Sequence, residues 1–214
     1  GIYTESDASG DIHKYCVDLS RVLSSKYGVK FRFNEKVKDI NGTSFPIIST
    51  DKEDIPFDKV VICAGVKTQE FRNKFRDNFR IYPVKGYSIT IDLDDEISKS
   101  AAPHVSIKDD HNKIVSSRLG NRLRVAGTAE LAGENKEVRE ERITPLIEWV
   151  NNCFPEVNTE NIITWAGLRP MTSDMVPIMR ESKRKNVFYN SGHGHLGWTM
   201  GAFAGKFISD LIED

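Results

Sequence analysis

The run Gly192-His193-Gly194-His195-Leu196-Gly197 combines residue types and spacing that could hold a ligand. It follows a stretch typical of a strand, 186–190, and precedes a stretch typical of a helix that begins at Trp198. Glycines let a backbone approach a ligand closely, and the positive end of a helix favours negative charge. The pattern therefore predicts either contact with an anion or cofactor, or a tight structural turn.

The same run satisfies Gly-x-Gly-x-x-Gly, but that motif also needs a second strand with an acidic residue about 20 positions further on. Residues up to Asp214 leave room only for a helix, so we do not expect a complete dinucleotide-binding unit. Gly197, Gly201 and Gly205 share one helix face, and each glycine inside a helix costs about 1 kcal/mol relative to Ala. Because the remaining residues are mostly apolar, we expect a buried helix whose glycines face backbone or a flat ligand.

Arg169 is the second candidate for ligand binding. It ends the apolar strand-like run from Trp165 and precedes Pro170, which favours an extended conformation at Arg169. We expect its guanidinium to point out of the strand end, where a rigid fork of donors suits a carboxylate. A salt bridge to a nearby acid such as Asp174 is the alternative.

The composition is that of a globular protein without a strong charge bias. The 214 residues include 30 Lys and Arg against 31 Asp and Glu, and the net charge of -1 gives no reason to expect a nucleic acid partner. The three cysteines lie far apart, which argues against a disulfide framework or structural zinc and favours a reducing compartment. The chain begins without Met or a signal peptide, so we expect a piece of a longer protein.

The first half of the chain predicts elements of both kinds. Apolar residues at helical spacing predict a helix over 11–27, and alternation predicts a strand over 29–33. Asn41-Gly42 is a hairpin candidate, and the apolar run 60–65 is typical of a strand buried on both faces. A short helix over 67–80 should present Phe71, Phe75 and Phe79 on one stripe.

The second half predicts a sheet followed by further elements. Residues 82–129 indicate an antiparallel meander, and Thr144-Pro145 marks the start of a helix that ends near Pro155. Cys63 and Cys153 are expected to be small core residues. The order of elements indicates an α+β fold.

Longer stretches carry a resemblance to a known family. Residues 164–174 and 190–200 resemble the carboxyl-terminal signature of the bacterial D-amino acid dehydrogenases, within the D-amino acid oxidase superfamily of FAD enzymes. Residues 28–34 and 82–88 resemble the middle of the same enzymes, so the likeness covers essentially the whole chain. The combined motifs are specific for the superfamily, and the dehydrogenase assignment rests mainly on the loop 192–200.

The resemblance implies an α+β fold with an antiparallel or mixed-sheet substrate domain over 80–183. Residues 1–79 and 184–214 would be the remnant of a glutathione-reductase-like FAD-binding domain. In that family a preceding βαβ unit holds the FAD pyrophosphate and ribose. The resemblance therefore implies a missing amino-terminal FAD-binding segment, and poor FAD binding by these residues alone.

The resemblance also implies roles for individual residues. Arg169 would clamp the substrate carboxylate, while Lys85, Gly86 and Tyr87 would line the edge of the flavin and substrate, with Tyr87 and Arg169 as the catalytic pair. The remaining cofactor contacts would be Val37 at adenine, Ala64 and Gly65 at phosphate and ribose, and Gly192, His193, Gly194, His195, Leu196 and Gly197 at the pyrimidine side of the flavin. A positive helix end there would stabilise a reduced flavin.

The implied reaction is hydride transfer from a D-amino acid to non-covalent FAD, which gives a 2-oxo acid and ammonia. A respiratory electron acceptor is implied as a partner, in the cytoplasm or peripherally at the inner membrane. His193 or His195 could act as a general base, although the resemblance assigns no such base. The alternatives are a glycine or secondary-amine oxidase and a non-catalytic binding module that has lost FAD.

Overall fold

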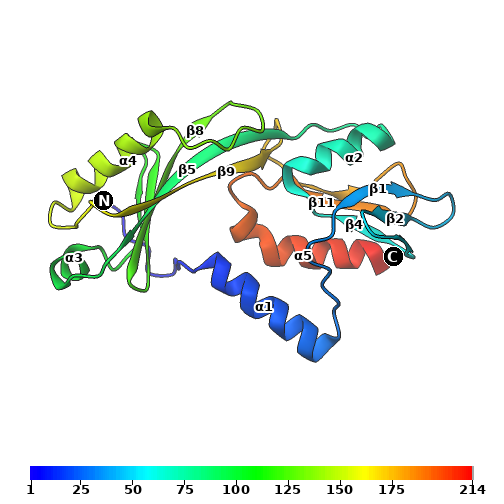
Figure 1. The fold of residues 1–214 in the computed structure, drawn as a ribbon, viewed down its shortest axis with the longest axis horizontal. Coiled ribbons are helices and arrows are strands. Elements are labelled where there is room, and N and C mark those ends of the chain that lie inside the picture. Colours follow the sequence, from blue (N-terminus) through cyan, green and yellow to red (C-terminus); the bar gives the residue numbers. More distant parts are fainter. Residues whose placement is uncertain (214) are drawn as a thin grey trace. The chain divides into compact units, whose positions relative to one another are not determined.

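The computed structural model describes residues 1–213 of the chain and confirms a mixed fold of helices, antiparallel sheet and mixed sheet (Figure 1). The helices are α1 (Ile12–Tyr27), the short 3₁₀ helix η1 (Gly65–Lys67), α2 (Thr68–Phe75), α3 (Glu96–Ala101), α4 (Glu140–Cys153) and α5 (Gly197–Glu213). The strands are β1 (Val37–Asn41), β2 (Ile47–Thr50), β3 (Asp54–Pro56), β4 (Val60–Ile62), β5 (Tyr82–Asp92), β6 (Ile107–Asp109), β7 (Ile114–Leu119), β8 (Arg122–Glu130), β9 (Ile162–Met171), β10 (Ile178–Glu181) and β11 (Val187–Ser191).

The chain divides into two compact units. The first unit comprises Gly1–Val22 and Lys85–Leu168, and the second comprises Leu23–Val84 and Arg169–Asp214. The boundaries that the sequence suggested, at 79/80 and 183/184, stay a prediction about functional domains.

The first unit is built on a five-stranded sheet in the order β6-β7-β8-β5-β9. Helix α4 lies along this sheet (Figure 1) and packs Ile143, Leu146, Trp149 and Val150 into its core. Strand β5 lies inside the sheet between β8 and β9, and its consecutive residues 85–89 are all buried, so both faces of the strand are covered there. The core of this unit is therefore the helix–sheet layer, with Ile89, Leu123 and Val125 completely buried.

The second unit contains two small sheets that share a core. Strands β1-β2-β3 form an antiparallel sheet, and β10-β11-β4 form a mixed sheet in which β11 and β4 are parallel. Ile40 of the first sheet packs with Ile62 and Val187 of the second. Since α5 contacts β10 and β11, the mixed sheet is bound on that side by the carboxyl-terminal helix.

Several predicted elements are confirmed. Helix α1, strand β11 and helix α5 lie where the sequence placed them, whereas β4 covers only the first half of the strand predicted over 60–65. The hairpin at Asn41-Gly42 is present as β1 and β2 with a five-residue connection, and Gly42 takes a positive φ of 85° that suits glycine. The meander over 82–129 is antiparallel as expected, but α3 interrupts it.

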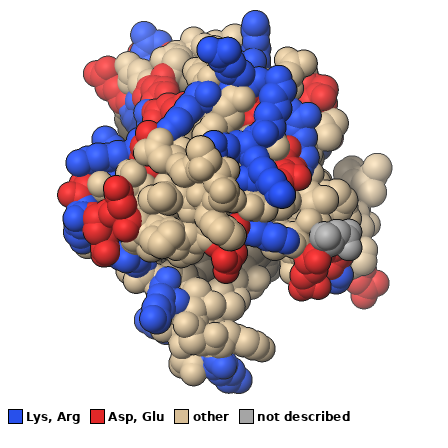
Figure 2. Space-filling model, turned by 90° about the vertical axis from the view of Figure 1, so that its right-hand side faces the viewer, with Lys and Arg blue, Asp and Glu red and all other residues tan. Residues whose placement is uncertain are grey.

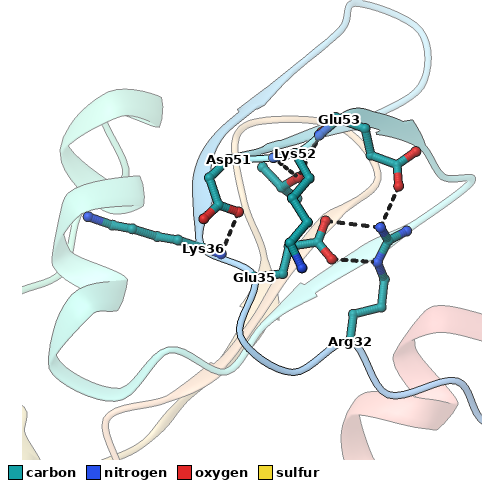
Figure 3. Close-up of polar contacts among 7 residues, drawn as sticks. Arg32, Glu35, Lys36, Asp51, Lys52 and Glu53 are labelled. Carbon is teal, nitrogen blue, oxygen red and sulfur yellow. Dashed lines mark hydrogen bonds and ion pairs between the residues drawn. The ribbon is translucent and has the colours of Figure 1, made fainter.

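The predicted strand over 29–33 is wrong. This segment has no strand pairing, and Figure 3 shows what holds it instead: Arg32 bonds Glu35 at 2.7 and 3.0 Å and Glu53 at 2.5 Å. The Lys36 N–H donates to Asp51 at 3.0 Å. Side-chain pairs therefore anchor the segment that leads into β1, and alternation alone could not reveal that no partner strand was within reach.

Two helix boundaries also differ from the prediction. Helix α4 begins at Glu140, so Pro145 lies inside it rather than at its first position. The Thr144 hydroxyl donates to Glu140 O at 3.1 Å within the same turn. Helix α2 ends at Phe75, where Arg76 takes a left-handed conformation, and Phe79 reaches the core from the following loop.

The burial predicted for α5 is wrong. Only Ala204 and Ile208 of this helix are buried, while Phe203 is 58% exposed and Phe207 42%. A Cβ added at Gly201 or Gly205 would meet open space, so the glycine face is uncovered. Cys63 and Cys153 are also exposed rather than in the core.

The surface carries both signs of charge. Figure 2 shows Lys and Arg side chains interspersed with Asp and Glu on the face that it draws. Among the described residues, no helix combines the length and apolar character that a membrane span requires.

Candidate functional site

The second unit brings the ends of two parallel strands together. Strand β4 pairs with β11 in parallel, so Gly65, just after β4, and Gly192, just after β11, lie at the same edge of the sheet. The buried hydroxyl of Ser191 links them, because it accepts from Thr68 Oγ1 at 2.9 Å and donates to Gly65 O at 3.2 Å. This edge is where open parallel sheets bind ligands.

The glycines at this edge differ in the space that a side chain would find there. Gly192 and Gly194 have positive φ values of 78° and 55°, and an added Cβ would lie 2.9 Å from Thr172 Cγ2 and 2.5 Å from Met171 Sδ, respectively. Close packing within the protein therefore accounts for both. Gly65, with a φ of 56°, has open space where a side chain would be, so its backbone is accessible.

The run 192–197 is bonded to the end of β9. The Gly194 N–H donates to Pro170 O at 3.0 Å, and Met171 forms an antiparallel bridge with His193. Arg169 precedes Pro170 directly and is partly buried. The structure thus places Arg169 on the strand that borders the glycine loop.

Arg169 does not end its strand, as the sequence suggested. Strand β9 continues to Met171 because residues 170 and 171 pair with the glycine loop. This interaction joins residues more than 20 positions apart in the sequence, and the local pattern at Arg169-Pro170 contains no sign of it.

His193 has the properties of a neutral imidazole. It is partly buried, and burial holds its pKa below the ordinary value. Its Nε2 atom is buried and makes no hydrogen bond with any residue in the described part of the chain. A buried polar atom without a partner is costly, so this nitrogen is available to a group that the protein binds.

The amide groups of the loop are only partly available. The Leu196 N–H donates to His193 O at 2.9 Å, and the Met200 N–H to Leu196 O at 2.9 Å. Gly197 and Thr199 lie in the first turn of α5, where the helix itself offers no acceptor to their N–H groups. His195 and Leu196 are exposed beside them.

Val37 and Ala64 have exposed positions in the second unit. Val37 begins β1, opposite Thr50, and is 42% exposed. The neighbouring contact between Lys36 N and Asp51 keeps its backbone in place (Figure 3). Ala64 follows β4 and precedes Gly65, so it lies at the same edge as the glycine loop.

The remaining predicted site residues, Lys85, Gly86 and Tyr87, lie in the first unit. All three are buried, with Lys85 at 0% exposure and Tyr87 at 1%. Tyr87 donates through its hydroxyl to Glu130 Oε2 at 2.5 Å, and Lys85 Nζ lies 3.4 Å from the same oxygen. Arg139 Nη1 donates to Glu130 Oε1 at 2.5 Å.

Glu130 and Arg139 were not predicted from the sequence. Glu130 is only 9% exposed, and the hydroxyl of Tyr87, followed by Arg139 and Lys85, lowers its pKa to about 2 against the opposing effect of burial. It is therefore ionised and carries the charge that two cations face. No local motif marks it, because its place opposite Lys85 depends on the register of β5 and β8.

The predicted residues thus form two groups. Ala64, Gly65, Arg169 and the run 192–197 gather around the end of the mixed sheet in the second unit, with Val37 elsewhere in that unit. Lys85, Gly86 and Tyr87 join Glu130 and Arg139 in the first unit.

Comparison with known families agrees with the geometry of the sheet edge. Residues 1–211 match the family model described as "FAD dependent oxidoreductase". The chain belongs to this family, known as DAO.

The chain is also similar to curated proteins that are named D-amino acid dehydrogenase. The chain is 48% identical over 217 residues to "D-amino acid dehydrogenase 3" of Mesorhizobium japonicum, and 37% identical over 216 residues to the D-amino acid dehydrogenase of Paramagnetospirillum magneticum. These matches cover 99% and 100% of the chain but 52% and 50% of the relatives. The chain therefore spans about half the length of the curated relatives it matches.

Solved structures agree on the fold. Iminodiacetate oxidase from Chelativorans has a TM-score of 0.82 at 22% identity, covering 94% of this chain and 54% of its own. Glycine oxidase from Geobacillus kaustophilus has a TM-score of 0.74 at 22% identity, covering 84% and 48%. The DAO fold is thus confirmed, as is the α+β class expected from the sequence.

The residues at the sheet edge fit an FAD group. The backbone at Gly65 is open, the buried His193 Nε2 lacks a partner among residues 1–213, and α5 directs its first turn to the same loop. These features suit a polar, anionic cofactor at the ends of β4 and β11.

Proposed function

We propose that the protein oxidises D-amino acids to 2-oxo acids and ammonia. The observation that carries this proposal is the 48% identity to "D-amino acid dehydrogenase 3", over 99% of the chain. The position of Arg169 supports it, because a guanidinium on the strand beside the glycine loop suits an amino acid carboxylate. Arg169 and Tyr87 are the proposed catalytic residues, and the cofactor contacts are those expected from the resemblance.

FAD, when bound, supplies the hydride acceptor for this chemistry. Ala64 and Gly65 would hold its phosphate and ribose at the end of β4, and Val37 would contact adenine through its backbone. The run 192–197 would hold the pyrimidine side, where the first turn of α5 favours negative charge. His193 Nε2, neutral and buried, could accept or donate one hydrogen bond there.

We further propose that another segment of the protein completes the cofactor site, in the part of the relatives' length that lies outside these residues. Two features support this: β4 has β11 as its partner within the mixed sheet and is an edge strand, and α5 exposes Phe203, Phe207 and an open glycine face. The full-length protein is the chain that includes this segment. A respiratory electron acceptor and a cytoplasmic or peripheral inner-membrane location are part of the proposal.

A glycine or secondary-amine oxidase is the second candidate. Solved neighbours named glycine oxidase and iminodiacetate oxidase share the fold, and the glycine oxidase from Bacillus cereus is 26% identical over 84% of this chain. A small or secondary amine would still need Arg169 for its carboxylate, so the candidates differ in substrate and not in the site.

Anaerobic flavin reduction separates the two candidates. The full-length protein with FAD would be mixed with D-alanine, L-alanine, glycine or sarcosine, and bleaching of the flavin absorbance would be followed. We expect D-alanine to reduce the flavin fastest and L-alanine not to react. Faster reduction by glycine or sarcosine would favour the second candidate, and no reduction by any of the amines would contradict both.

A further inference from the structure

Two short segments of the second unit carry a local excess of positive charge. Residues 72–80 contain four Lys and Arg against one Asp, and residues 180–185 contain four against one Glu. The whole chain has a net charge of -1, so the excess belongs to these segments and not to the composition. The basic surface consists of the eight cations of the two segments: Arg72, Lys74, Arg76, Arg80, Arg180, Lys183, Arg184 and Lys185.

The tertiary structure brings the two segments together. The carboxylate of Asp77 accepts from Lys183 N at 2.8 Å, and Lys183 Nζ donates to Arg76 O at 2.9 Å. Arg180 Nη2 donates to Asn78 O at 3.1 Å. These hydrogen bonds join segments more than 100 positions apart in the sequence, so the eight cations belong to one surface.

Most of this charge has no carboxylate beside it. Within residues 1–213, Lys74 is the one member of the basic surface that pairs with a carboxylate, that of Asp39. Lys183 and Arg180 bond to carbonyl oxygens, which orient a side chain without cancelling its charge. All members except Arg72 and Arg184 are exposed. The basic surface therefore attracts anions.

A hollow of about 340 Å³ lies within the basic surface. Lys74, Lys183 and Arg184 line it, together with the end of β1 at Asn41 and Gly42. Arg184 Nη2 donates to Asn41 O at 3.3 Å, which holds the guanidinium at this place. An ammonium carries three N–H donors and a guanidinium five, more than these bonds use. A phosphate group that enters the hollow would therefore find several charged donors.

An exposed aromatic side chain adjoins the basic surface. Phe45 lies in the connection between β1 and β2 and is 58% exposed. Asn186 Nδ2 donates to Ser44 O at 3.3 Å, so this connection lies against the turn that carries cations 183–185. Aromatic residues beside Lys and Arg are typical of proteins that bind at a membrane interface, where the cations meet head groups and the ring meets acyl chains.

We propose that the basic surface docks the protein onto a lipid bilayer that contains anionic head groups, with Phe45 in the interface and a head-group phosphate in the hollow. The choice of a lipid surface depends on Phe45, because a nucleic acid or another soluble polyanion would pair with the cations and leave the ring in water. This inference deepens the proposed function and rests on it for the peripheral location, but not for the reaction.

The first test is sedimentation of the full-length protein, loaded with FAD, with lipid vesicles. We expect it to bind vesicles that contain phosphatidylglycerol, more weakly as salt is added, and not to bind phosphatidylcholine alone. A triple variant should bind about 100-fold more weakly, because each cation near an anionic surface contributes about fivefold. Its substitutions are Lys183→Gln, Arg184→Gln and Lys185→Gln. No binding by the parent, or equal binding to both kinds of vesicle, would overturn the proposal.

A matched control removes the same charge from the first unit. It replaces Lys108, Lys113 and Lys136 by Gln, all at exposed positions. Lys108 and Lys113 lie within 4.0 Å of Asp110, so their charge is already compensated. This variant should bind vesicles as the parent does. An equal loss in both triple variants would show that only net charge matters and would overturn the proposal.

The second test uses Phe45→Ser, which keeps every cation and remains decisive if the triple variant does not fold. We expect binding to vesicles with phosphatidylglycerol to weaken about tenfold, the effect of losing a ring that leaves water. Unchanged vesicle binding in Phe45→Ser, or tighter binding of the parent to duplex DNA than to vesicles, would overturn the proposal. Flavin reduction by D-alanine is measured without vesicles, so a failure of the proposed reaction leaves the vesicle result intact.

Discussion

The position of Arg169 depends on contacts between the end of its strand and a loop more than 20 residues further along the chain. The carbonyl oxygen of Pro170 accepts from the Gly194 N–H at 3.0 Å, and Met171 pairs with His193, so Arg169 lies beside the glycine loop. A guanidinium held on a strand loses little freedom when it forms a bidentate pair with a carboxylate.

Arg169→Ala in the full-length protein should therefore weaken D-amino acid use far more than flavin binding. We expect kcat/KM for D-alanine to fall by about 10- to 100-fold, the effect of losing a charge-assisted pair. Flavin content after gel filtration should match the parent. Arg169→Lys, which keeps the charge without the fork, should recover part of the loss. Equal activity in Arg169→Ala and parent would remove Arg169 from the site.

Glu130 predicts an acid-dependent contribution to stability. Its pKa falls from an ordinary value of 4.5 to about 2 in the folded protein, chiefly through the bond from Tyr87. A depressed pKa stabilises the fold above the unfolded value, and the effect is lost as pH falls toward the folded value. Urea unfolding should therefore show Glu130→Gln less stable than the parent at neutral pH, with the gap narrowing between about pH 4.5 and 2. A gap that is independent of pH would contradict this, and Glu137→Gln serves as the control.

Strand β8 contains one residue, Thr128, with an unfavourable backbone conformation. Because Thr128 adopts a φ of 59°, Thr128→Gly should relieve the strain, and the gain should exceed the entropy that glycine adds to the unfolded chain. We expect a net stabilisation of up to about 1 kcal/mol in denaturant unfolding. Thr90→Gly, in the regular part of β5, should instead destabilise by about 1 kcal/mol. Destabilisation by both variants would argue that the Thr128 side chain matters more than its backbone.

Helix α2 is joined to the β10–β11 hairpin by a buried carboxylate. Asp77, which follows α2 and is 4% exposed, accepts from Ser182 Oγ at 2.5 Å, Tyr189 Oη at 2.8 Å and Lys183 N at 2.8 Å. The hydrogen bonds connect segments more than 100 residues apart in the sequence.

Asp77→Ala should cost about 3 kcal/mol of unfolding free energy, because it leaves buried donors unpaired. Thermal or urea unfolding of the protein would measure this loss. Asp58→Ala, at an exposed position, is the matched control and should change stability little. A loss below about 1 kcal/mol for Asp77→Ala would show that water replaces the carboxylate.

The chain as a whole presents surfaces that isolated globular proteins usually cover. Helix α1 has no buried residue, and α5 exposes Phe203, Phe207 and Trp198. The chain also spans about half the length of its curated relatives. Both facts agree with the proposal that a further segment shares the cofactor site.

This proposal predicts different flavin retention in two proteins. The 214-residue chain, mixed with FAD and passed through gel filtration, should lose most of the flavin, because only part of the contacts is present. The full-length protein should retain it in stoichiometric amount with a perturbed absorbance spectrum. Stoichiometric flavin on the 214-residue chain would contradict the proposal, and loss from both proteins would favour a binding module without a cofactor.

The sequence predicts those features that depend on interactions between residues close together in the chain. Helices α1 and α5 and strands β4 and β11 follow from local periodicity, and the glycine run and Arg-Pro motif are specific enough to indicate the family. The prediction of a strand over 29–33 is wrong, because a strand needs a partner strand and this segment has none. The predicted start of α4 is wrong because the helix begins at Glu140 and contains Pro145. The resemblance named Lys85 and Tyr87 but not Glu130, whose place opposite Lys85 depends on the register of β5 and β8.

The amino-acid sequence by itself determined the class of fold, the family and the residues to inspect, because periodicity and motifs are properties of neighbouring residues. Only the tertiary structure decided that Arg169 borders the glycine loop and that Glu130, rather than Ala129, faces Lys85. Both depend on the register between distant strands, where a shift of one residue exchanges the side chains on a face. That register is set by packing across the sheet, which a linear pattern does not contain.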